Sequence, residues 1–458
     1  MTLAYCRGCF EKQLEINRLK EEIERLKAKV RYQERTAKEG VFGSSTPSAK
    51  VPLKPNALEE RQARRGGGKA GHEGHGRGRV EAAEADRVER VAVPDCCPDC
   101  GRTMESEGTD TRTVVEMEPV RVRRVLYRLE RKRCPHCGRR VEARAPGVLP
   151  KALYGNALLT HVAVQHYVRG VTLGQLGDQL EIGNGSLVEA MHQLARRLKP
   201  VSERLVQAYR EAPVKHADET SWRTDGRNGY AWLFATPDLS LFRLRKTRAA
   251  AVVEEILGPD PLPGTLVVDR YNGYNRAPCA IQYCYAHLLR LVTDLEKDFP
   301  GHPEVKAFVE RLAPLLAKAM ELRTMGLSRR RFRAQAAALK AEIVAVVHRP
   351  ARHPAIQNVQ DIFRQNAERL YRWAEDPTIP ADNNLAERDL RPLVIARKVS
   401  FGSQSPAGAS TRETLMSVLR TLQKRTQDVA AALKSALDKL VEDPALDLSS
   451  ALFPPKRP

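Results

Sequence analysis

The chain contains no apolar run that approaches the roughly 18 residues of a membrane span. Its first residues, Met1-Thr-Leu-Ala-Tyr-Cys-Arg, also lack the apolar core of a signal peptide. We therefore expect a cytoplasmic protein without a membrane partner. The length of 458 residues predicts about three domains, with at least one sizeable core.

Acidic residues are too few to balance the basic ones. Asp and Glu number 56 against 76 Lys and Arg, which gives a formal net charge of +20. Because many arginines occur in clusters, this surplus favours a polyanionic partner over a general solubility role. A merely basic protein is the alternative.

Cysteine occurs nine times, an odd number that argues against a disulfide framework. Cys97-Pro-Asp-Cys100-Gly and Cys134-Pro-His-Cys137-Gly repeat one C-P-x-C-G motif, whose glycine allows a turn that exposes N–H groups to thiolate. Together the two motifs predict one structural Zn²⁺ site with four thiolate ligands in a reducing compartment; a redox pair is the alternative. Cys96 is a substitute ligand in this scheme.

The segment between the two motifs predicts a hairpin, because residues 113–117 and 120–129 alternate like strands. We expect residues 91–150 to form a zinc-binding module that recognises DNA. Its candidate DNA contacts are the cations of the second strand and motif, namely Arg121, Arg123, Arg124, Arg128, Arg131, Lys132 and Arg133.

Residues 10–38 carry a short coiled-coil pattern. Apolar residues follow Ile16 at 3,4,3,4 spacing, with charged residues between them: Leu19, Ile23, Leu26 and Val30. The pattern favours a homodimer or higher homo-oligomer, with an amphipathic helix packed on its own domain as the alternative. Cys6 and Cys9 are either exposed thiols or half of a zinc site shared with a second chain. Residues 39–90 are a basic, Gly-rich linker, either a solvated tether or a segment that follows DNA.

Residues 151–212 have helical periodicity. Two apolar segments flank the turn Gly183-Asn-Gly-Ser186, and Ser186 is a suitable N-cap for the second. Helix, turn and helix in this order resemble a helix-turn-helix DNA reader, and ordinary helical packing is the alternative.

Residues 213–300 predict the first part of an α/β core. Strands are expected around Asp218, at 230–236, at 241–244 and at 265–268, with a helix at 249–257 and another from His287. Three strands, a helix, a strand and a helix is the order of a ribonuclease-H-like fold, in which the first and fourth strands are neighbours. Asp218 and Asp269 would then lie side by side, at strand ends where open α/β sheets build their sites.

The second part of the core, residues 379–458, follows an α-helical insertion over 301–378. It supplies Glu387 from a helix that we expect Pro392 to end or kink. Two strand-end aspartates and this glutamate are suited to hold two Mg²⁺ ions, or Mn²⁺, because hard cations prefer oxygen ligands. Arg388, Arg391, Arg397 and Lys398 are candidate DNA contacts nearby, with solvated helix charges as the alternative.

Four motifs make the sequence closely similar to the insertion-sequence-66 family of bacterial transposases. They are His216-Ala-Asp-Glu-Thr-Ser-Trp, Val267-Val-Asp-Arg-Tyr-Asn-Gly-Tyr, Cys284-Tyr-Ala-His287-Leu-Leu-Arg and Asn383-Asn-Leu-Ala-Glu-Arg-Asp-Leu-Arg-Pro. The paired cysteine motifs and the Gly-rich linker occur in the family's order.

The resemblance implies a DDE transposase with the catalytic triad Asp218, Asp269 and Glu387. Such an enzyme binds double-stranded element ends and target DNA, cleaves and joins strands, and works in the bacterial cytoplasm on the nucleoid, with or without accessory proteins. Cys284 and His287 match a C-x-x-H element of similar transposases, as a structural pair or a catalytic one. The rival functions are a catalytically silent, zinc-dependent DNA-binding regulator and a nuclease that cuts without joining.

Overall fold

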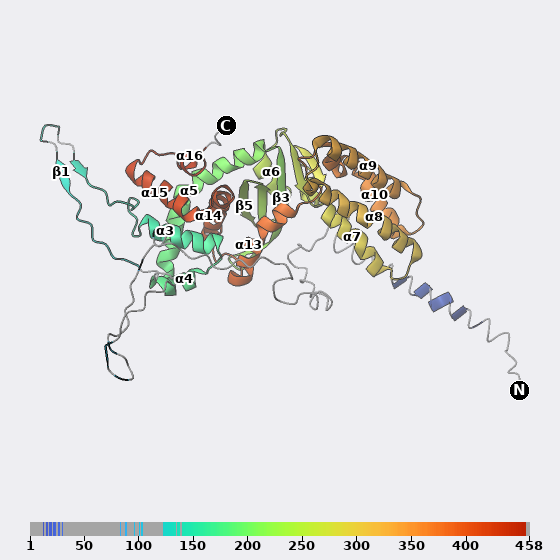
Figure 1. Ribbon diagram of the computed structural model, residues 1–458, viewed down its shortest axis with the longest axis horizontal. Coiled ribbons are helices and arrows are strands. Elements are labelled where there is room, and N and C mark those ends of the chain that lie inside the picture. Colours follow the sequence, from blue (N-terminus) through green and yellow to red (C-terminus); the bar gives the residue numbers. More distant parts are fainter. Residues whose placement is uncertain are drawn as a thin grey trace. The chain divides into compact units, whose positions relative to one another are not determined.

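The computed structural model describes residues 140–454 continuously, and before them 122–133, 135–137 and single positions between 12 and 103. The chain forms two compact units: Leu53–Arg123 is one, and Met1–Pro52 with Arg124–Pro458 is the other. Everything below concerns the second unit unless stated otherwise (Figure 1). No helix within the described part of the chain has the length and apolar character needed to cross a membrane.

A mixed five-stranded sheet organises this unit. Its order is β5-β4-β3-β6-β7, so the first and fourth strands along the chain are neighbours, as expected. β3, β4 and β5 pair antiparallel, whereas β6 and β7 join parallel to β3 and to one another. The strands are β3 (Val214–Thr224), β4 (Arg227–Thr236), β5 (Leu239–Arg245), β6 (Thr265–Val268) and β7 (Ala280–Tyr283).

Both faces of the sheet are buried, because side chains of a strand alternate between its two faces. In β4, Trp232 and Phe234 belong to one apolar core, whereas Ala231, Leu233 and Ala235 belong to the other. Complete burial of a large apolar side chain such as Trp232 stabilises the fold by roughly 1.5–3 kcal/mol. The sheet is therefore the middle layer of the unit, with helices on each side.

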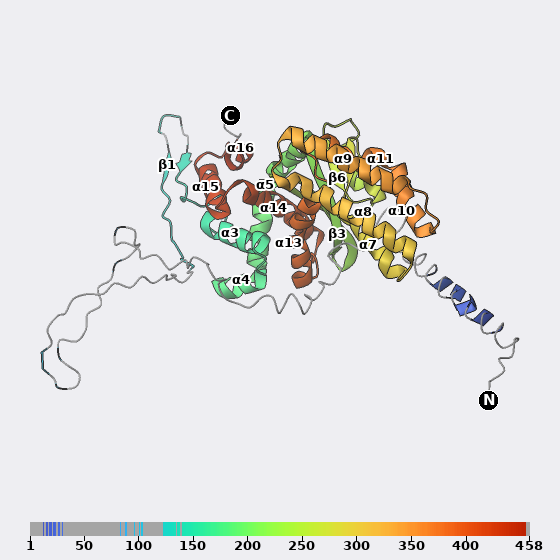
Figure 2. The same ribbon diagram turned by 45° about the vertical axis from the view of Figure 1, so that its right-hand side comes forward.

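Helices from the chain between β5 and residue 375 share the first core (Figures 1 and 2). They include α6 and α7, followed by the helices that fill the segment 301–378. Their bounds are α6 (Ala251–Leu257), α7 (Tyr285–Asp298), α8 (Pro303–Glu321), η4 (Leu322–Met325), α9 (Arg329–His348), α10 (Pro354–Gln365), α11 (Ala367–Leu370) and α12 (Arg372–Glu375), with the short η3 (Asn272–Tyr274) before β7.

Helices from both ends of the described chain share the second core. Those before the sheet are α3 (Asn156–Ala163), η2 (Val164–Val168), α4 (Leu173–Leu180) and α5 (Asn184–Glu211). Those after it are α13 (Asn384–Ser400), α14 (Pro406–Arg425), α15 (Val429–Glu442) and α16 (Leu448–Leu452).

α4 and α5 form the expected helix, turn and helix. Thr172 caps α4 in a capping box with Gln175. The expectation that Ser186 caps the second helix is wrong, because α5 begins at Asn184 with Gly183 at the N-cap. The turn brings Asn184 so close to Gly177 that a Cβ at position 177 would lie 2.8 Å from Asn184 Oδ1.

The expectation that Pro392 ends the helix is also wrong, since α13 continues through it to Ser400. Proline removes the hydrogen bond to the carbonyl one turn earlier. However, Leu390 and Leu393 on either side of it are buried in the second core. Packing against the sheet therefore holds α13 together where local propensity would end it.

A short hairpin, β1 (Arg131–Arg133) and β2 (Arg140–Glu142), encloses the second cysteine motif. The expected strand over 120–129 is wrong for residues 122–129, which are irregular. Its apolar side chains, Val125 and Leu126 among them, are exposed, so no buried face stabilises an extended pairing there.

The described positions between 12 and 30 are helical. Ile16, Leu19, Ile23, Leu26 and Val30 are 45–54% exposed, so this side of the helix is free for another surface. Pairing with a second chain stays a prediction.

Candidate active site

Asp218 and Asp269 come from neighbouring strands. β3 and β6 pair in parallel from Val214↔Thr265 to His216↔Val267, so two further residues on each strand lead to Asp218 and Asp269. Asp269 directly follows β6, as expected. Asp218 lies inside β3, because pairing with β4 extends the strand to Thr224. It nevertheless lies just beyond the carboxyl end of the β3–β6 pairing, so both aspartates lie at the edge of the sheet formed by the carboxyl ends of its parallel strands.

Glu387 reaches this edge from the first turns of α13, which packs across β3 and β4 (Figures 1 and 2). The N-cap residue Asn383 fastens the helix to β3: its Nδ2 donates to Ala217 O at 2.8 Å, and its Oδ1 accepts from His216 Nδ1 at 2.9 Å. Glu387 N in turn donates to Asn383 O at 3.2 Å. Asn383 therefore sets where α13 begins and where Glu387 lies.

The three carboxylates influence one another electrostatically. Burial raises the pKa of Asp218 well above its usual value, and Glu219, Asp269 and Glu387 raise it further. Burial also raises the pKa of Asp269; Glu387 adds to this, while the Tyr271 N–H, Arg248 and Arg270 oppose it. Like charges held together in a partly buried place favour a bound cation.

The donor atoms of these three side chains have the chemistry that a hard divalent cation prefers. All three offer carboxylate oxygens, the ligands that Mg²⁺ and Mn²⁺ prefer. Among the described residues, Glu387 Oε1 is buried and has no hydrogen-bond partner. A bound cation would satisfy this oxygen, and so would a closer contact with His287 Nδ1, which is 3.9 Å away and also lacks a hydrogen-bond partner in the part of the chain that the structure describes.

Glu219, the nearest competing acid, is engaged elsewhere. Its carboxylate accepts from Arg248, with Nε at 2.8 Å, and from the Tyr274 hydroxyl. Burial raises the pKa of Glu219 to about 7 and Asp269 adds to this, whereas Arg248 and Tyr274 lower it. Arg248 also stacks on the Tyr271 ring, 3.8 Å from its centroid. Because the Glu219 carboxylate is bonded to Arg248 and Tyr274, Asp218 is the better candidate on β3 to share a cation with Asp269.

Cys284 and His287 lie beside Glu387. The ligand atoms of these three residues lie within 4.8 Å of one another, and His287 Nδ1 is 3.9 Å from Glu387 Oε1. Cys284 Sγ accepts from Asn383 N at 3.2 Å, and burial raises the pKa of this thiol to about 12. Thiolate and imidazole ligands suit Zn²⁺ better than Mg²⁺. Of Cys284, His287 and Glu387, only Glu387 offers the carboxylate oxygen that Mg²⁺ prefers.

The basic residues of α13 differ in exposure. Arg388, Arg391 and Lys398 are exposed. Arg397 is half-buried and its Nη1 donates to Thr220 Oγ1 at 2.8 Å and to Ser221 O at 2.6 Å. Arg397 thus ties α13 to β3, a contact that sequence patterns did not indicate.

The cysteine module is described only in part. Cys97, Cys134 and Arg121 lie outside the described residues. Cys100 and Cys137 are exposed, and a bridge between Cys96 and Thr103 closes the chain around the first motif within its own unit. The exposed cations on the described part are Arg123, Arg124, Arg128, Arg131, Lys132 and Arg133.

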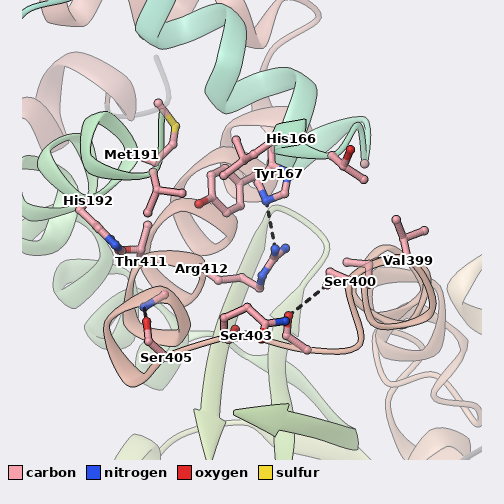
Figure 3. A pocket seen from close by; sticks show the side chains of 18 residues that line it. His166, Tyr167, Met191, His192, Val399, Ser400, Ser403, Ser405, Thr411 and Arg412 are labelled. Atoms are coloured by element: carbon pink, nitrogen blue, oxygen red, sulfur yellow. Dashed lines mark hydrogen bonds between the residues drawn. The ribbon is translucent and has the colours of Figure 1, made fainter. Parts of the chain in front are cut away.

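A separate cavity of about 270 Å³ lies among η2, α4, α5, α13 and α14 (Figure 3). Within it, Arg412 donates to His166 Nε2 at 3.0 Å, and His192 Nδ1 lies 2.6 Å from Thr411 Oγ1. Among the described residues, no acidic side chain lines this cavity.

Two protein-family descriptions match the chain. Residues 151–411 match the family described as "Transposase IS66 family", and residues 94–138 match the "zinc-finger binding domain of transposase IS66". The chain is 25% identical to "Uncharacterized protein y4qI" of Sinorhizobium fredii over 415 residues, covering 81% of this chain and 76% of the relative. It is 24% identical to "Uncharacterized protein y4jD" of the same organism over 397 residues, covering 78% and 77%.

Proposed function

The chain belongs to the transposase IS66 family, and on that premise we propose that it binds the ends of an insertion sequence and catalyses DNA cleavage and strand transfer. One observation carries the proposal. Asp269, from the strand adjacent to that of Asp218, and Glu387, from α13, lie near enough to Asp218 that their charges raise its pKa. Paired acids at such a strand edge suit metal-assisted phosphodiester chemistry.

The strand order supports a ribonuclease-H-like core. Three antiparallel strands are followed by two parallel ones, with the fourth strand of the chain beside the first. In such a core, the helices of 301–378 are an insertion between the second aspartate and the glutamate.

Asp218, Asp269 and Glu387 would hold the catalytic cations, Mg²⁺ or Mn²⁺, which stabilise charge on the entering and leaving oxygens of the phosphodiester. Asn383 and His216 position Glu387, and Cys284 with His287 supports the same turn. Arg388, Arg391 and Lys398 hold the DNA backbone beside the acids by charge attraction.

The cysteine module would bind DNA ends. Cys97, Cys100, Cys134 and Cys137 would hold one structural Zn²⁺, which fits the match of residues 94–138 to a zinc finger. The basic residues around the second motif would then contact phosphates. Pairing through the segment whose described positions between 12 and 30 are helical would join two copies on DNA.

The test is Mg²⁺-dependent cleavage and joining of DNA bearing the element's ends, with Asp269→Asn as the variant and Asp260→Asn, an exposed loop residue, as the control. We expect all proteins to bind, and Asp269→Asn alone to lose cleavage and joining. Binding without chemistry in all three, the wild type included, would favour a regulator. Cutting without joining of a pre-cleaved end would favour a nuclease, and equal activity in all three would refute the assigned site.

A further inference from the structure

The outward face of α13 combines positive charge with apolar side chains. At about 100° per residue, its exposed side chains fall within one sector of the helix. They are Asn384, Arg388, Arg391, Ile395, Lys398 and Val399, and Ile395 and Val399 are 57% and 50% exposed. Leu390, Leu393 and Arg397 occupy the opposite, packed side. Glu387 lies at the border between the two sides.

An exposed aromatic residue ends this face. Phe401 follows the last turn of α13 and is 74% exposed. Its backbone is left-handed, with φ of 57°, a conformation that side chains other than glycine and asparagine seldom adopt. A large apolar side chain in a strained, exposed position is a sign of function and not of packing.

The residues after Phe401 hold it in place. Ser403 N donates to Arg223 O at 2.9 Å, and Trp222 Nε1 donates to Ser403 Oγ at 3.2 Å. Gly402 approaches β3 so closely that a Cβ there would lie 2.2 Å from Arg223 O. The turn that follows Phe401 is therefore fixed to the end of β3.

We propose that an unpaired base of the substrate DNA stacks on Phe401 while Lys398, Arg391 and Arg388 hold phosphates along the strand between that base and the cleaved phosphate; this inference rests on the function proposed above. Three cations and no acid on the face match a polyanion, and a flat ring beside them matches a base. An apolar protein partner would leave those cations unpaired.

The geometry gives an approximate position for the base. Phe401 lies 14 residues beyond Glu387, which corresponds to about 21 Å along a helix axis. A strand that follows α13 advances about 3.4 Å per nucleotide, so the stacked base lies about six nucleotides from the cleaved phosphate.

The experiment places 2-aminopurine, a fluorescent base, at successive positions of the element end and measures emission when the full-length protein binds. We expect a change at one position about six nucleotides from the cleavage point. Phe401→Leu should abolish that change and weaken binding of DNA with an unpaired base there by about fivefold or more, with less than about twofold effect on paired DNA. Phe401→Trp should retain both, and Leu153→Ala, 82% exposed but outside α13, is the control.

The outcomes separate this inference from the proposed function. Normal cleavage with identical fluorescence in the wild type and Phe401→Leu would overturn the stacking inference alone. A fluorescence change that requires Phe401, in a protein that never cleaves, would support stacking and overturn the transposase. If Phe401 instead contacts a second copy of the chain, Phe401→Leu would lower the mass of the DNA-free protein in light scattering and leave the fluorescence unchanged.

Discussion

Replacing Asn383 by alanine should uncouple Glu387 from the two aspartates. Asn383 is 1% exposed, and its amide joins the start of α13 to both His216 and Ala217 O. Alanine removes two hydrogen bonds and leaves a buried carbonyl and a buried imidazole N–H without partners. At about 1–3 kcal/mol for each of the two orphaned groups, we expect a loss of roughly 2–6 kcal/mol in the free energy of unfolding.

The functional effect should exceed what this loss of stability explains. Glu387 N bonds to Asn383 O, so a shifted N-cap moves the glutamate with it. A displacement of about 1 Å in a catalytic group costs roughly a hundredfold in rate. We therefore expect the rate of Mg²⁺-dependent cleavage to fall by about that factor at a temperature where the variant is fully folded, with DNA affinity nearly unchanged.

Asn384→Ala is the matched control, because Asn384 is adjacent, chemically identical and exposed. Urea unfolding and single-turnover cleavage of the wild type and both variants decide the matter. Cleavage by Asn383→Ala within twofold of the wild type would refute the positioning role. An equal defect in Asn384→Ala would show that the first turn as a whole, and not the Asn383 amide, is responsible.

Two further predictions concern other parts of the chain. Cys97→Ser with Cys134→Ser should release one Zn²⁺ per chain, measured by elemental analysis, and weaken binding to DNA ends without altering urea unfolding of the core; retained zinc would contradict the four-thiolate site. The pKa of His166 is lowered to about 4, mainly by burial and further by the charge of Arg412. In the unfolded chain the same imidazole takes up a proton near pH 6.5. Its contribution to stability is complete above pH 6.5 and lost as the pH falls toward 4, so from pH 7 to 5 the wild type should lose about 2 kcal/mol more than His166→Asn in urea unfolding. Equal losses would show that His166 titrates normally.

Local pattern was sufficient to predict the strand before Asp269. Thr265-Leu-Val-Val is a short apolar run between Pro263-Gly264 and Asn272-Gly273, and its burial on both faces follows from that pattern alone. The length of β3 could not be predicted in the same way. Its residues around Asp218 include buried polar side chains such as Glu219 and Thr220, whose burial depends on partners elsewhere in the chain.

The supporting residues of the site were missed for the same reason. Asn383 is 166 residues from Ala217, and Glu219 is 29 residues from Arg248, so neither contact leaves a local signal. Pro392 shows the opposite error: a strong local signal was overridden by burial of Leu390 and Leu393 against the sheet. Motif and strand order locate the acids, but only tertiary contacts reveal what holds them.

In the proposed transposase, α13 connects the catalytic acids to the surface that binds DNA. Leu393 and Arg397 fix one side against β3 and β4, Glu387 faces the aspartates, and the third side presents cations and ends at Phe401. Because a helix is rigid over this length, a rotation that moved Glu387 would also turn the outward face. Contacts that hold the far end of the helix, such as those of Ser403 with Arg223 and Trp222, should therefore affect cleavage and DNA binding together. Exposed substitutions such as Lys398→Ala should affect DNA binding alone.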